Sequence, residues 1–350
     1  MITPDLKNRV LIAMSGGIDS SVAAFLIKEQ GCECAGATMK LLDGPDIAED
    51  AKNIASFLEM PHYIVDFKEF FEKEVLQYFA GMYIKGDTPN PCVVCNKFIK
   101  FGKMIQSAEE LGYDSIATGH YANVGYDDIT GRYLLKKAAD IKKDQSYVLF
   151  SLTQKQLKNI KFPLGSLTKQ EVRKIAEEQG FVNAQKKESQ DICFVRDGDY
   201  AGFIERYTGK TFPEGDFVDL SGKILGRHKG IIRYTVGQRR GLGLALPEPM
   251  YVCCKDAENN KIILCKEQEL YTKELVARNI NLIPFDRIDN KIKIKAKVRY
   301  NQTEQPASVE QTSEDTLHIE FESPQRAVTR GQAVVLYDGD VVVGGGTIGE

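Results

Sequence analysis

The residues Arg9–Met14 (RVLIAM), followed at once by Ser15–Ser21 (SGGIDSS), decide the fold of the first half of this sequence. The apolar run has the length and the β-branched content of a buried parallel strand. The Ser-Gly-Gly that ends it predicts a tight loop, and residues 20–30 then predict a helix that stops at Gly31. The chain therefore begins with a strand, a glycine loop and a helix.

The same alternation continues outward from this stretch. Further strands are predicted at residues 34–39, 63–65 and 115–118, and further helices at residues 47–58 and 98–111. Thr168-Lys-Gln-Glu171 has the spacing of a capping box, so another helix is expected to begin there and to end before Gly180. Alternating strands and helices predict an α/β fold with a doubly wound parallel sheet.

Beyond about residue 205 the sequence becomes rich in glycine and in short β-type runs. From Lys291 onward apolar residues alternate with Lys and Arg, as in a strand with one buried face. Asp338-Gly339 lies between two apolar runs and predicts a hairpin. We therefore expect three domains: an α/β domain at 1–205, a mostly β central domain at 206–275, and a small barrel or sandwich at 276–350.

The composition is that of an ordinary globular protein, with 350 residues, 43% hydrophobic and 27% charged, and a net charge of −3. No apolar run approaches the roughly 18 residues that a membrane span requires. The first residues lack the pattern of a secretory signal, so we expect a cytoplasmic protein with no membrane partner. Net charge neither supports nor excludes nucleic-acid binding, which would depend on local basic patches.

The glycine loop has the chemistry of a phosphate site. Adjacent Gly16 and Gly17 allow successive backbone N–H groups to face one anion at the start of a helix. The loop is neither a Walker A motif nor G-x-G-x-x-G. It resembles the SGGxDS pyrophosphate loop of the ATP pyrophosphatases, which adenylate a carbonyl oxygen and release pyrophosphate. Asp19 could reach a bound Mg²⁺ or a nucleotide hydroxyl.

Two of the eight Cys are candidates for chemistry. Cys95 follows a proline-rich loop and lies near a predicted helix start and two lysines, Lys97 and Lys100, which favours its nucleophilic thiolate. Cys193 lies between two apolar residues and fits either a sulfur carrier or a small buried hydrophobe. The others are expected in the core: Cys32, Cys34, Cys253, Cys254 and Cys265.

Cys92 and Cys95 also have the spacing of a metal or cluster half-site. With Cys193 as third ligand they would hold an iron–sulfur cluster that has one open iron position. A thioredoxin-like redox pair is a further alternative, which the proline-rich approach and the absence of Trp disfavour. The four His are scattered, so no zinc site of the usual Cys/His spacing is visible.

Across nearly its whole length the sequence resembles the tRNA-specific 2-thiouridylases, the MnmA family. The resemblance implies an N-terminal ATP-pyrophosphatase domain, a small central domain that binds tRNA, and a C-terminal β-barrel. It rests on motifs in the family's order: AMSGGIDSS (13–21), ATMK (37–40), TPNPCVVCNKFIKFG (88–102), ATGHYA (117–122), KKDQSYVLF (142–150), ESQDICF (188–194), GRHKG (226–230), YTVGQRRGLG (234–243), VRYNQ (298–302) and RGQAVVLYDGDVVVGGG (330–346).

The resemblance implies ATP-dependent 2-thiolation of the wobble uridine of a tRNA, with ATP and Mg²⁺ required. The sulfur would come as a persulfide from a cysteine desulfurase or a sulfur-relay protein. Cys193 would carry the persulfide and Cys95 would be its partner thiol. The residues expected to bind ATP are Ala13, Met14, Ser15, Gly16, Gly17, Ile18, Asp19, Ser20, Met39 and Gly119. Those expected to contact the tRNA or its target base are Asn90, Pro91, Cys92, His120, Lys143, Asp144, Gln145, Arg299, Tyr300 and Gln332.

Two other functional classes share parts of this pattern. Amide-forming synthetases have the same loop but need neither Cys95 nor Cys193, and a non-catalytic RNA-binding module would not convert ATP to AMP. Typical family members have Asp at the position of Cys92, which strengthens the cluster alternative here. The basic residues between Gly226 and Gly243, with Tyr234 among them, are the best candidates for contacts with RNA.

Overall fold

The computed structural model describes residues 8–44, 48–181, 192–195 and 197–349. Its first sheet is wholly parallel, in the order β3-β2-β1-β4-β7. The strands are β1 (Arg9–Ala13), β2 (Glu33–Lys40), β3 (His62–Asp66), β4 (Ser115–Thr118) and β7 (Ile160–Lys161). The strands and the glycine loop predicted from residues 9–118 are confirmed.

Helices cover both faces of this sheet. Val10 and Ile12 of β1 pack into one cluster with the helices of one face, while Leu11 and Ala13 pack into the other cluster, because neighbouring residues of a strand point to opposite faces. The first cluster includes residues of α1 (Ile18–Glu29), α2 (Glu49–Phe57) and α8 (Lys169–Glu178), and the second residues of α6 (Met104–Glu110). The predicted doubly wound α/β fold is therefore confirmed.

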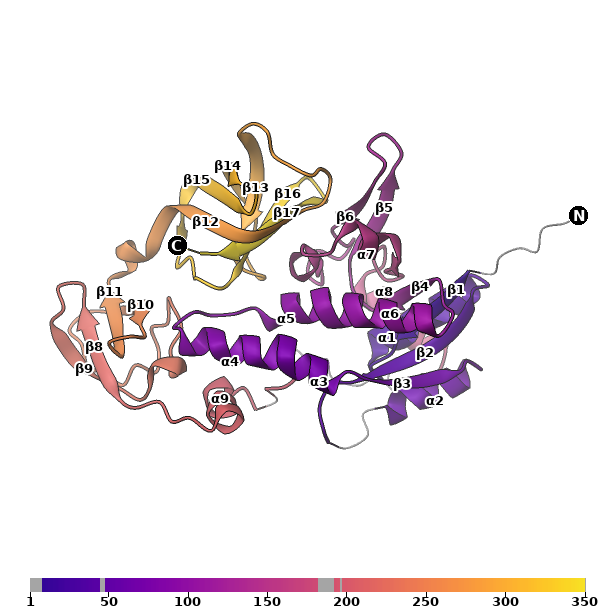
Figure 1. The fold of residues 1–350 in the computed structure, drawn as a ribbon, viewed down its shortest axis with the longest axis horizontal. Helices are drawn as coiled ribbons and strands as arrows, with labels where there is room; N and C mark the ends of the chain where they lie inside the picture. Colours follow the sequence, from indigo (N-terminus) through magenta and orange to yellow (C-terminus); the bar gives the residue numbers. More distant parts are fainter. Residues whose placement is uncertain (1–7, 45–47, 182–191, 196, 350) are drawn as a thin grey trace, which may run out of the picture.

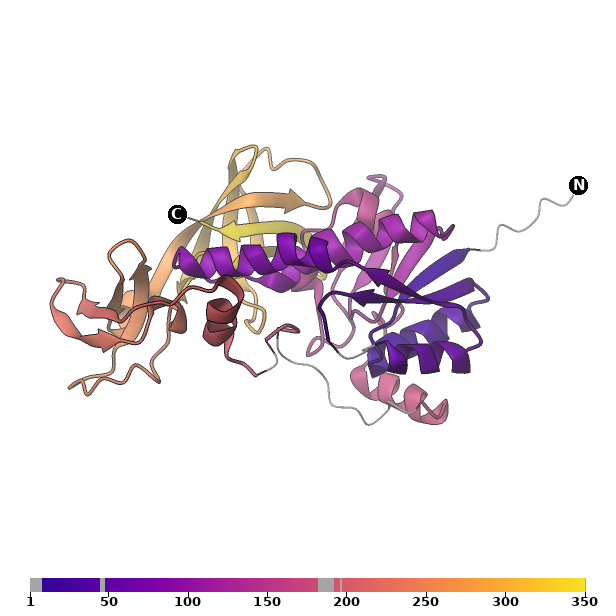
Figure 2. The same ribbon diagram turned by 60° about the horizontal axis from the view of Figure 1, so that its bottom comes forward.

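Two long helical segments lie side by side and run from the parallel sheet toward the middle domain (Figures 1 and 2). One comprises α3 (Lys68–Phe71), η1 (Glu72–Leu76) and α4 (Gln77–Ile84), which the sequence analysis missed. The other comprises α5 (Pro91–Val94), η2 (Cys95–Lys103) and α6, so it begins earlier than the predicted residue 98. Both η1 and η2 are π-helical, a geometry that often occurs at functional sites.

The middle domain follows at the far end of these helices from the parallel sheet (Figure 1). Its four-stranded sheet has the order β10-β11-β8-β9. The elements are α9 (Tyr200–Thr208), β8 (Gly215–Asp219), β9 (Ile224–His228), η4 (Ile231–Arg233), β10 (Tyr251–Asp256), β11 (Lys261–Cys265) and η5 (Glu267–Leu270).

The last strands form an antiparallel barrel in the order β12-β15-β14-β13-β16-β17, which pairing between β12 and β17 closes. The predicted hairpin is confirmed at Asp338-Gly339, where Gly339 has a φ of +59°. The strands are β12 (Tyr271–Leu282), β13 (Ile292–Lys297), β14 (Gln305–Ser313), β15 (Thr316–Arg326), β16 (Ala333–Asp338) and β17 (Val341–Ile348).

A hairpin of the first domain joins the barrel's sheet. It consists of β5 (Asn123–Asp127) and β6 (Arg132–Lys136), and Lys136 pairs with Val341 of β17. Lys137 extends the contact, because its backbone N–H donates to Asp340 and its ammonium to the Gly339 carbonyl. The first domain and the barrel are thus connected by main-chain hydrogen bonds. The remaining short helices are η3 (Ser146–Leu149) and α7 (Gln154–Lys158).

Candidate active site

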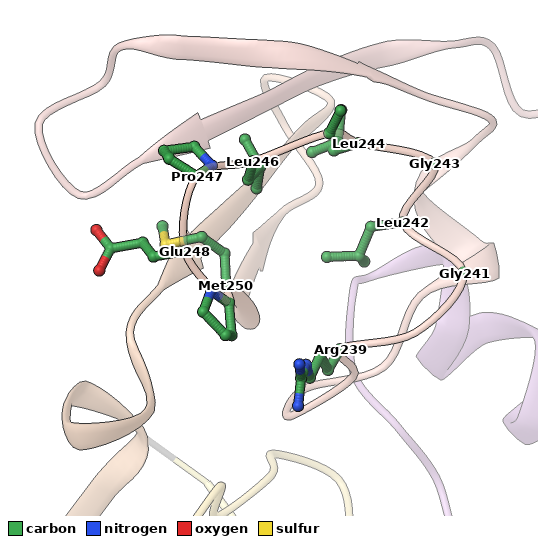
Figure 3. A pocket seen from close by; sticks show the side chains of 11 residues that line it. Arg239, Gly241, Leu242, Gly243, Leu244, Leu246, Pro247, Glu248 and Met250 are labelled. Atoms are coloured by element: carbon green, nitrogen blue, oxygen red, sulfur yellow. The ribbon is translucent and has the colours of Figure 1, made fainter.

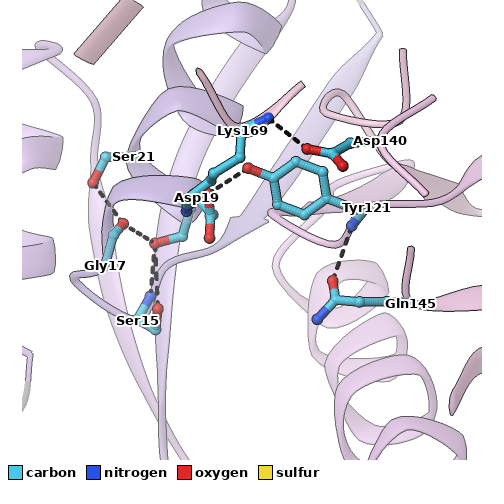
Figure 4. Close-up of polar contacts among 9 residues, drawn as sticks. Ser15, Gly17, Asp19, Ser21, Tyr121, Asp140, Gln145 and Lys169 are labelled. Carbon is cyan, nitrogen blue, oxygen red and sulfur yellow. Dashed lines mark hydrogen bonds and ion pairs between the residues drawn. The ribbon is translucent and has the colours of Figure 1, made fainter. Parts of the chain in front are cut away.

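The glycine loop lies between β1 and α1 and is organised by its own side chains (Figure 4). The Ser20 hydroxyl donates to the Gly17 carbonyl at 2.9 Å and accepts from the Ser15 N–H at 3.2 Å. Within the described residues no side chain caps the start of α1, whose N-cap Gly17 is extended. An uncapped helix start, with a loop that holds it open, fits the polyphosphate of ATP.

Two glycines of the predicted ATP site are required by close contacts. A Cβ on Gly119 would lie 2.7 Å from the carbonyl carbon of Asp19 and 2.8 Å from the Ser20 nitrogen. A Cβ on Gly16, whose φ is +73°, would lie 2.7 Å from the Asp50 Cβ. The loop is therefore clamped between the end of β4 and the start of α2, and only residues without a side chain fit at these points.

Asp19 is engaged by two residues that the sequence analysis did not single out. The buried Lys169 ammonium and the Tyr121 hydroxyl both reach its Oδ1, each at 2.7 Å (Figure 4). Lys169 is the first residue of α8, which begins with the predicted capping box of Thr168 and Glu171. The role of Asp19 in binding Mg²⁺ stays a prediction, and any such ion would share the carboxylate with Lys169.

Burial sets the charge state of Cys95, the first residue of the π-helical segment. The side chain is 7% exposed, and this desolvation raises its pKa to about 12, although the Lys100 ammonium opposes the shift. The sequence-based expectation of a stabilised thiolate in the free protein is therefore wrong, because desolvation outweighs the helix start and the lysines. The thiol is protonated at neutral pH.

Cys92 and Cys193 both lie near enough to Cys95 to influence its ionisation. Cys193 is exposed, and its neighbour Phe194 packs edge-to-face on Phe71 and Phe79 of the helical segment beside Cys95. The fold thus brings together thiols from distant parts of the sequence. Among the described residues no three His, Cys, Asp or Glu side chains are arranged to hold a metal ion. Glu188–Asp191 of the motif before Cys193 lie outside the described residues.

Asn90 and Pro91 start the helix that carries Cys92 and Cys95, as N-cap and first residue. The barrel holds the loop before them: the Gln332 amide donates to the Thr88 and Pro89 carbonyls at 3.0 and 3.2 Å. Gln332 therefore positions the proline-rich loop, and its predicted contact with tRNA stays a prediction.

His120 is buried, with its ring against Phe101 and Phe162. Its Nδ1 lies 2.8 Å from the Thr118 hydroxyl and its Nε2 lies 3.5 Å from the Lys100 ammonium. Burial, followed by the Lys100 charge, lowers its pKa well below the usual value, so the ring is neutral. A direct tRNA contact of His120 stays a prediction.

The predicted tRNA-binding segment 143–145 forms an internal loop. The buried Asp144 carboxylate accepts from the Ser146 hydroxyl at 2.6 Å and from the Ala138 N–H at 3.0 Å. The Gln145 side chain accepts from the Tyr121 N–H at 2.9 Å (Figure 4). Gln145 therefore connects this loop to Tyr121 and, through it, to Asp19, while Lys143 is partly exposed.

Tyr300 connects the barrel to the thiols. Its ring is 38% exposed and packs edge-to-face on Tyr147, and desolvation, Asp144 and then Cys92 raise its pKa to about 12. Lys297, which the alternation of β13 had placed among exposed lysines, is instead buried beneath three tyrosine rings, at 5.5–5.9 Å from Tyr147, Tyr300 and Tyr337. The neighbouring Arg299 donates to the Ala327 carbonyl.

The middle domain has a separate hollow of about 570 Å³, formed by the loop from Arg239 to Met250 (Figure 3). Apolar side chains line most of it, namely leucines, prolines, Ala245 and Met250, and Arg239 lies at one side. It lies next to the basic stretch 226–243 that the sequence marks for RNA contacts. It is apart from the glycine loop, which belongs to the first domain.

Comparison with known proteins gives consistent matches along the chain. Three family models match: the tRNA methyl transferase HUP domain at 8–197, the tRNA methyl transferase PRC-barrel domain at 201–266, and the aminomethyltransferase beta-barrel domain at 272–348. The tRNA-specific 2-thiouridylase MnmA of Acetivibrio thermocellus is 50% identical over 98% of this chain and 99% of that protein. The chain belongs to the tRNA-specific 2-thiouridylase family.

Other members are similarly close. The MnmA protein of Clostridioides difficile is 46% identical, and MnmA 1 of Caldanaerobacter subterraneus subsp. tengcongensis is 48% identical, each over 98% of both chains. The resemblance inferred from the motifs and the three-part architecture is thereby confirmed. Within the described ranges, every helix is too short or too polar to cross a bilayer.

Proposed function

We propose that this chain transfers sulfur to C2 of the wobble uridine of tRNA, using ATP. The observation that carries the proposal is the convergence of Cys95 and Cys193 in one chain with an open, uncapped phosphate loop. The printed names of its relatives, which are tRNA-specific 2-thiouridylases, support the same reaction. An amide-forming synthetase would have no use for the paired thiols.

ATP would place its polyphosphate at the start of α1. There the helix dipole and the loop N–H groups stabilise negative charge as pyrophosphate leaves. Transfer of AMP to the C2 oxygen converts a poor leaving group into a good one. Mg²⁺, when bound, neutralises phosphate charge, and Asp19 with its Lys169 partner is the carboxylate at the loop that fits this role.

Cys193 and Cys95 differ in exposure, and each suits a different step of the sulfur transfer. The exposed Cys193 is accessible to a protein that donates sulfur, and it would carry the persulfide that attacks C2 as AMP leaves. Cys95 would then attack the Cys193 sulfur, which releases 2-thiouridine and leaves a Cys95–Cys193 disulfide. Because Cys95 is buried and protonated in the free protein, it does not consume the persulfide before the base is bound.

The residues around the thiols would receive the base. Tyr300 presents a partly exposed ring near Cys92, and Asn90 and Pro91 begin the helix that carries Cys92. A splayed-out uridine would stack at this place. The domain boundaries 205/206 and 275/276 remain part of this proposal. So do the sulfur donor, a cysteine desulfurase or relay protein, and the tRNA contacts assigned to Lys143 and Arg299.

The alternative is a cluster-dependent transfer in which Cys92, Cys95 and Cys193 would hold an iron–sulfur cluster. The proximity of these thiols and the Cys at position 92 favour it. The described side chains form no three-ligand group, so no step is assigned to a cluster. A brown colour after anaerobic purification, with loss of that colour in Cys92→Ser, would support this route.

The test is a reconstituted reaction with ATP, Mg²⁺, a persulfide-generating desulfurase and unmodified tRNA, analysed by nucleoside mass spectrometry. We expect 2-thiouridine from the wild type, none from Cys95→Ser or Cys193→Ser, and normal product from the control Cys32→Ser. Formation of AMP without thiolated base by all four proteins, on several tRNAs and after cluster reconstitution, would refute the uridine assignment.

A further inference from the structure

Three cysteines outside the candidate active site lie together on one strand pair of the middle domain. β10 and β11 run antiparallel, with Tyr251 opposite Cys265 and Val252 opposite Leu264. The register then shifts, because Cys254 rather than Cys253 is opposite Ile263. This is a β-bulge at Cys253, a feature that breaks the side-chain alternation and redirects a side chain.

These cysteines differ in exposure. Cys265 is buried and Cys253 is half-buried, and both pack in one small cluster with Tyr251, Leu270 and Ala327. Cys254 is exposed, so the sequence-based expectation that it belongs to the core is wrong. The register shift at Cys253 lies beside both of these residues, one half-buried and one exposed.

The three thiols of this cluster differ in how readily they lose a proton. Hydrogen bonding from Cys254, and to a lesser degree from Cys265, lowers the pKa of Cys253 to about 6 against the opposing effect of burial. Burial, and then the charge of Cys253, raises the pKa of Cys265 to about 12, and the pKa of Cys254 is also raised. Cys253 is therefore the thiol of this cluster that ionises most readily.

Neither a metal site nor a vicinal bridge fits this arrangement. In the part of the chain that the structure describes, no three potential ligands are placed to hold a metal ion. Consecutive Cα atoms are about 3.8 Å apart. That separation is below the range of about 4.4–6.8 Å that ordinary disulfides span, which disfavours a Cys253–Cys254 bond. Cys265 is opposite Tyr251 on the neighbouring strand, but it packs in the same cluster as Cys253 and is the remaining thiol that can pair with it.

We propose that Cys253 is a site of thiol–disulfide exchange that takes a low-molecular-weight disulfide as its substrate, with Cys265 as the resolving thiol. The Cys253 thiolate attacks one sulfur of the disulfide RSSR, forming Cys253–S–SR and releasing RS⁻. Cys265 gives up its proton and attacks the Cys253 sulfur, forming the Cys253–Cys265 disulfide and releasing a second RS⁻. Two protein thiols are oxidised and one RSSR is reduced to two thiols.

The position of the pair gives the exchange a consequence. The cluster lies at the junction with the barrel: the Arg326 guanidinium is 5.2 Å from the Tyr251 ring centroid and pairs with Glu267. Ala327, which packs in the same cluster, accepts the hydrogen bond of Arg299. A bridge between β10 and β11 would therefore act on the contact that holds Arg299, a residue proposed to bind tRNA.

The test exposes the reduced full-length chain to glutathione disulfide, followed by acid quenching, alkylation and peptide mass spectrometry without reductant. We expect a Cys253–Cys265 cross-link in the wild type and in the control Cys32→Ser, which lies outside this cluster. In Cys265→Ser, one glutathione should remain on Cys253. In Cys253→Ser, uptake at this strand pair should fall at least about tenfold.

The pH dependence provides a second readout. Uptake by Cys253 should level off above about pH 7, whereas an ordinary thiol gains about tenfold per pH unit up to its pKa near 8.5. Uptake that persists unchanged in Cys253→Ser, or a wild type that keeps glutathione on Cys253 without forming the Cys253–Cys265 cross-link, would overturn the proposal. These readouts do not involve tRNA thiolation, so they are independent of the function proposed above.

Discussion

The glycine loop and the cysteine centre illustrate two ways of building a functional site. The loop is largely local: the hydrogen bonds among Ser15, Gly17 and Ser20 join residues five or fewer positions apart. The cysteine centre is assembled from segments far apart in the chain, and its chemistry is set by burial. A local motif carries its own geometry, whereas a tertiary site acquires its properties only when distant segments of the chain pack together.

The largest effect is expected at Gly119, because there the local loop packs against the end of a strand distant in the sequence. Gly119→Ala should reduce ATP-dependent AMP formation about 100-fold, because the new Cβ displaces the backbone of Asp19 and Ser20. Pyrophosphate release measures this effect. Gly81→Ala is the control, since nothing lies within 4 Å of its Cβ, and it should retain full activity. Equal activity in both variants would show that the loop tolerates displacement.

Lys169 sharpens the comparison, because it adds a tertiary contact to the local loop. Lys169→Met leaves the Asp19 carboxylate without its cation, and we expect about a tenfold rise in KM for ATP. The effect is no larger because Asp19 is partly exposed and water screens its charge. Lys174→Met, on the exposed side of the same helix, should leave KM unchanged. Steady-state kinetics of AMP formation decide the matter, and an unchanged KM in Lys169→Met would contradict the assigned role.

His120 tests whether burial controls ionisation near the thiols. Its folded pKa is lowered and its unfolded pKa is near 6.5, so the unfolded chain binds the proton more tightly. Its contribution to stability is therefore present above about pH 6.5 and is lost as pH falls below that value. Thermal unfolding at pH 5–8 should show that His120→Phe loses less stability on acidification than the wild type does.

The control for this titration is His318→Gln on the barrel, where the ring is partly exposed beside Glu274. This variant should keep the wild-type dependence on pH in the range assigned to His120. If His120→Phe and the wild type lose stability in parallel below pH 6.5, the histidine is not the group responsible.

The smallest effect is expected at the most local feature. Thr168→Ala removes the cap of α8, whose hydroxyl accepts from the Glu171 N–H at 3.3 Å, and should cost about 1 kcal/mol of unfolding free energy. Denaturant unfolding with AMP formation measured in parallel would show whether capping alone changes the position of Lys169. A stability loss without any change in KM for ATP would separate the cap from the site.

The sequence predicts well what short-range physics determines. The first strand, its glycine loop, the capping box at Thr168 and the hairpin at Asp338-Gly339 all depend on neighbouring residues, and all are confirmed. The helical segment 68–84 was missed although a signal was available, since its buried residues Phe71, Val75, Phe79 and Tyr83 recur every four positions, as on one helical face. The early start at Pro91 reflects proline's preference for the first helical turn.

What sequence reasoning could not supply is burial. The protonated state of Cys95, the neutral His120 and the tyrosine-covered Lys297 all result from packing between segments far apart in the sequence. Lys169 and Tyr121 were missed because they reach Asp19 from distant segments. A signal was available for Lys169, since the capping box before it fixes the start of a helix whose first residue can face the glycine loop.

The pairing of β6 with β17 bears on how this protein can be divided. A chain cut before the barrel would leave the outer edge of β6 without its partner and would uncover the carbonyl and amide groups of Lys136 and Lys137. Exposed strand edges recruit other strands, so such a fragment should self-associate. For this reason the ATP-binding half is better studied within the whole chain, or with the hairpin 123–136 shortened.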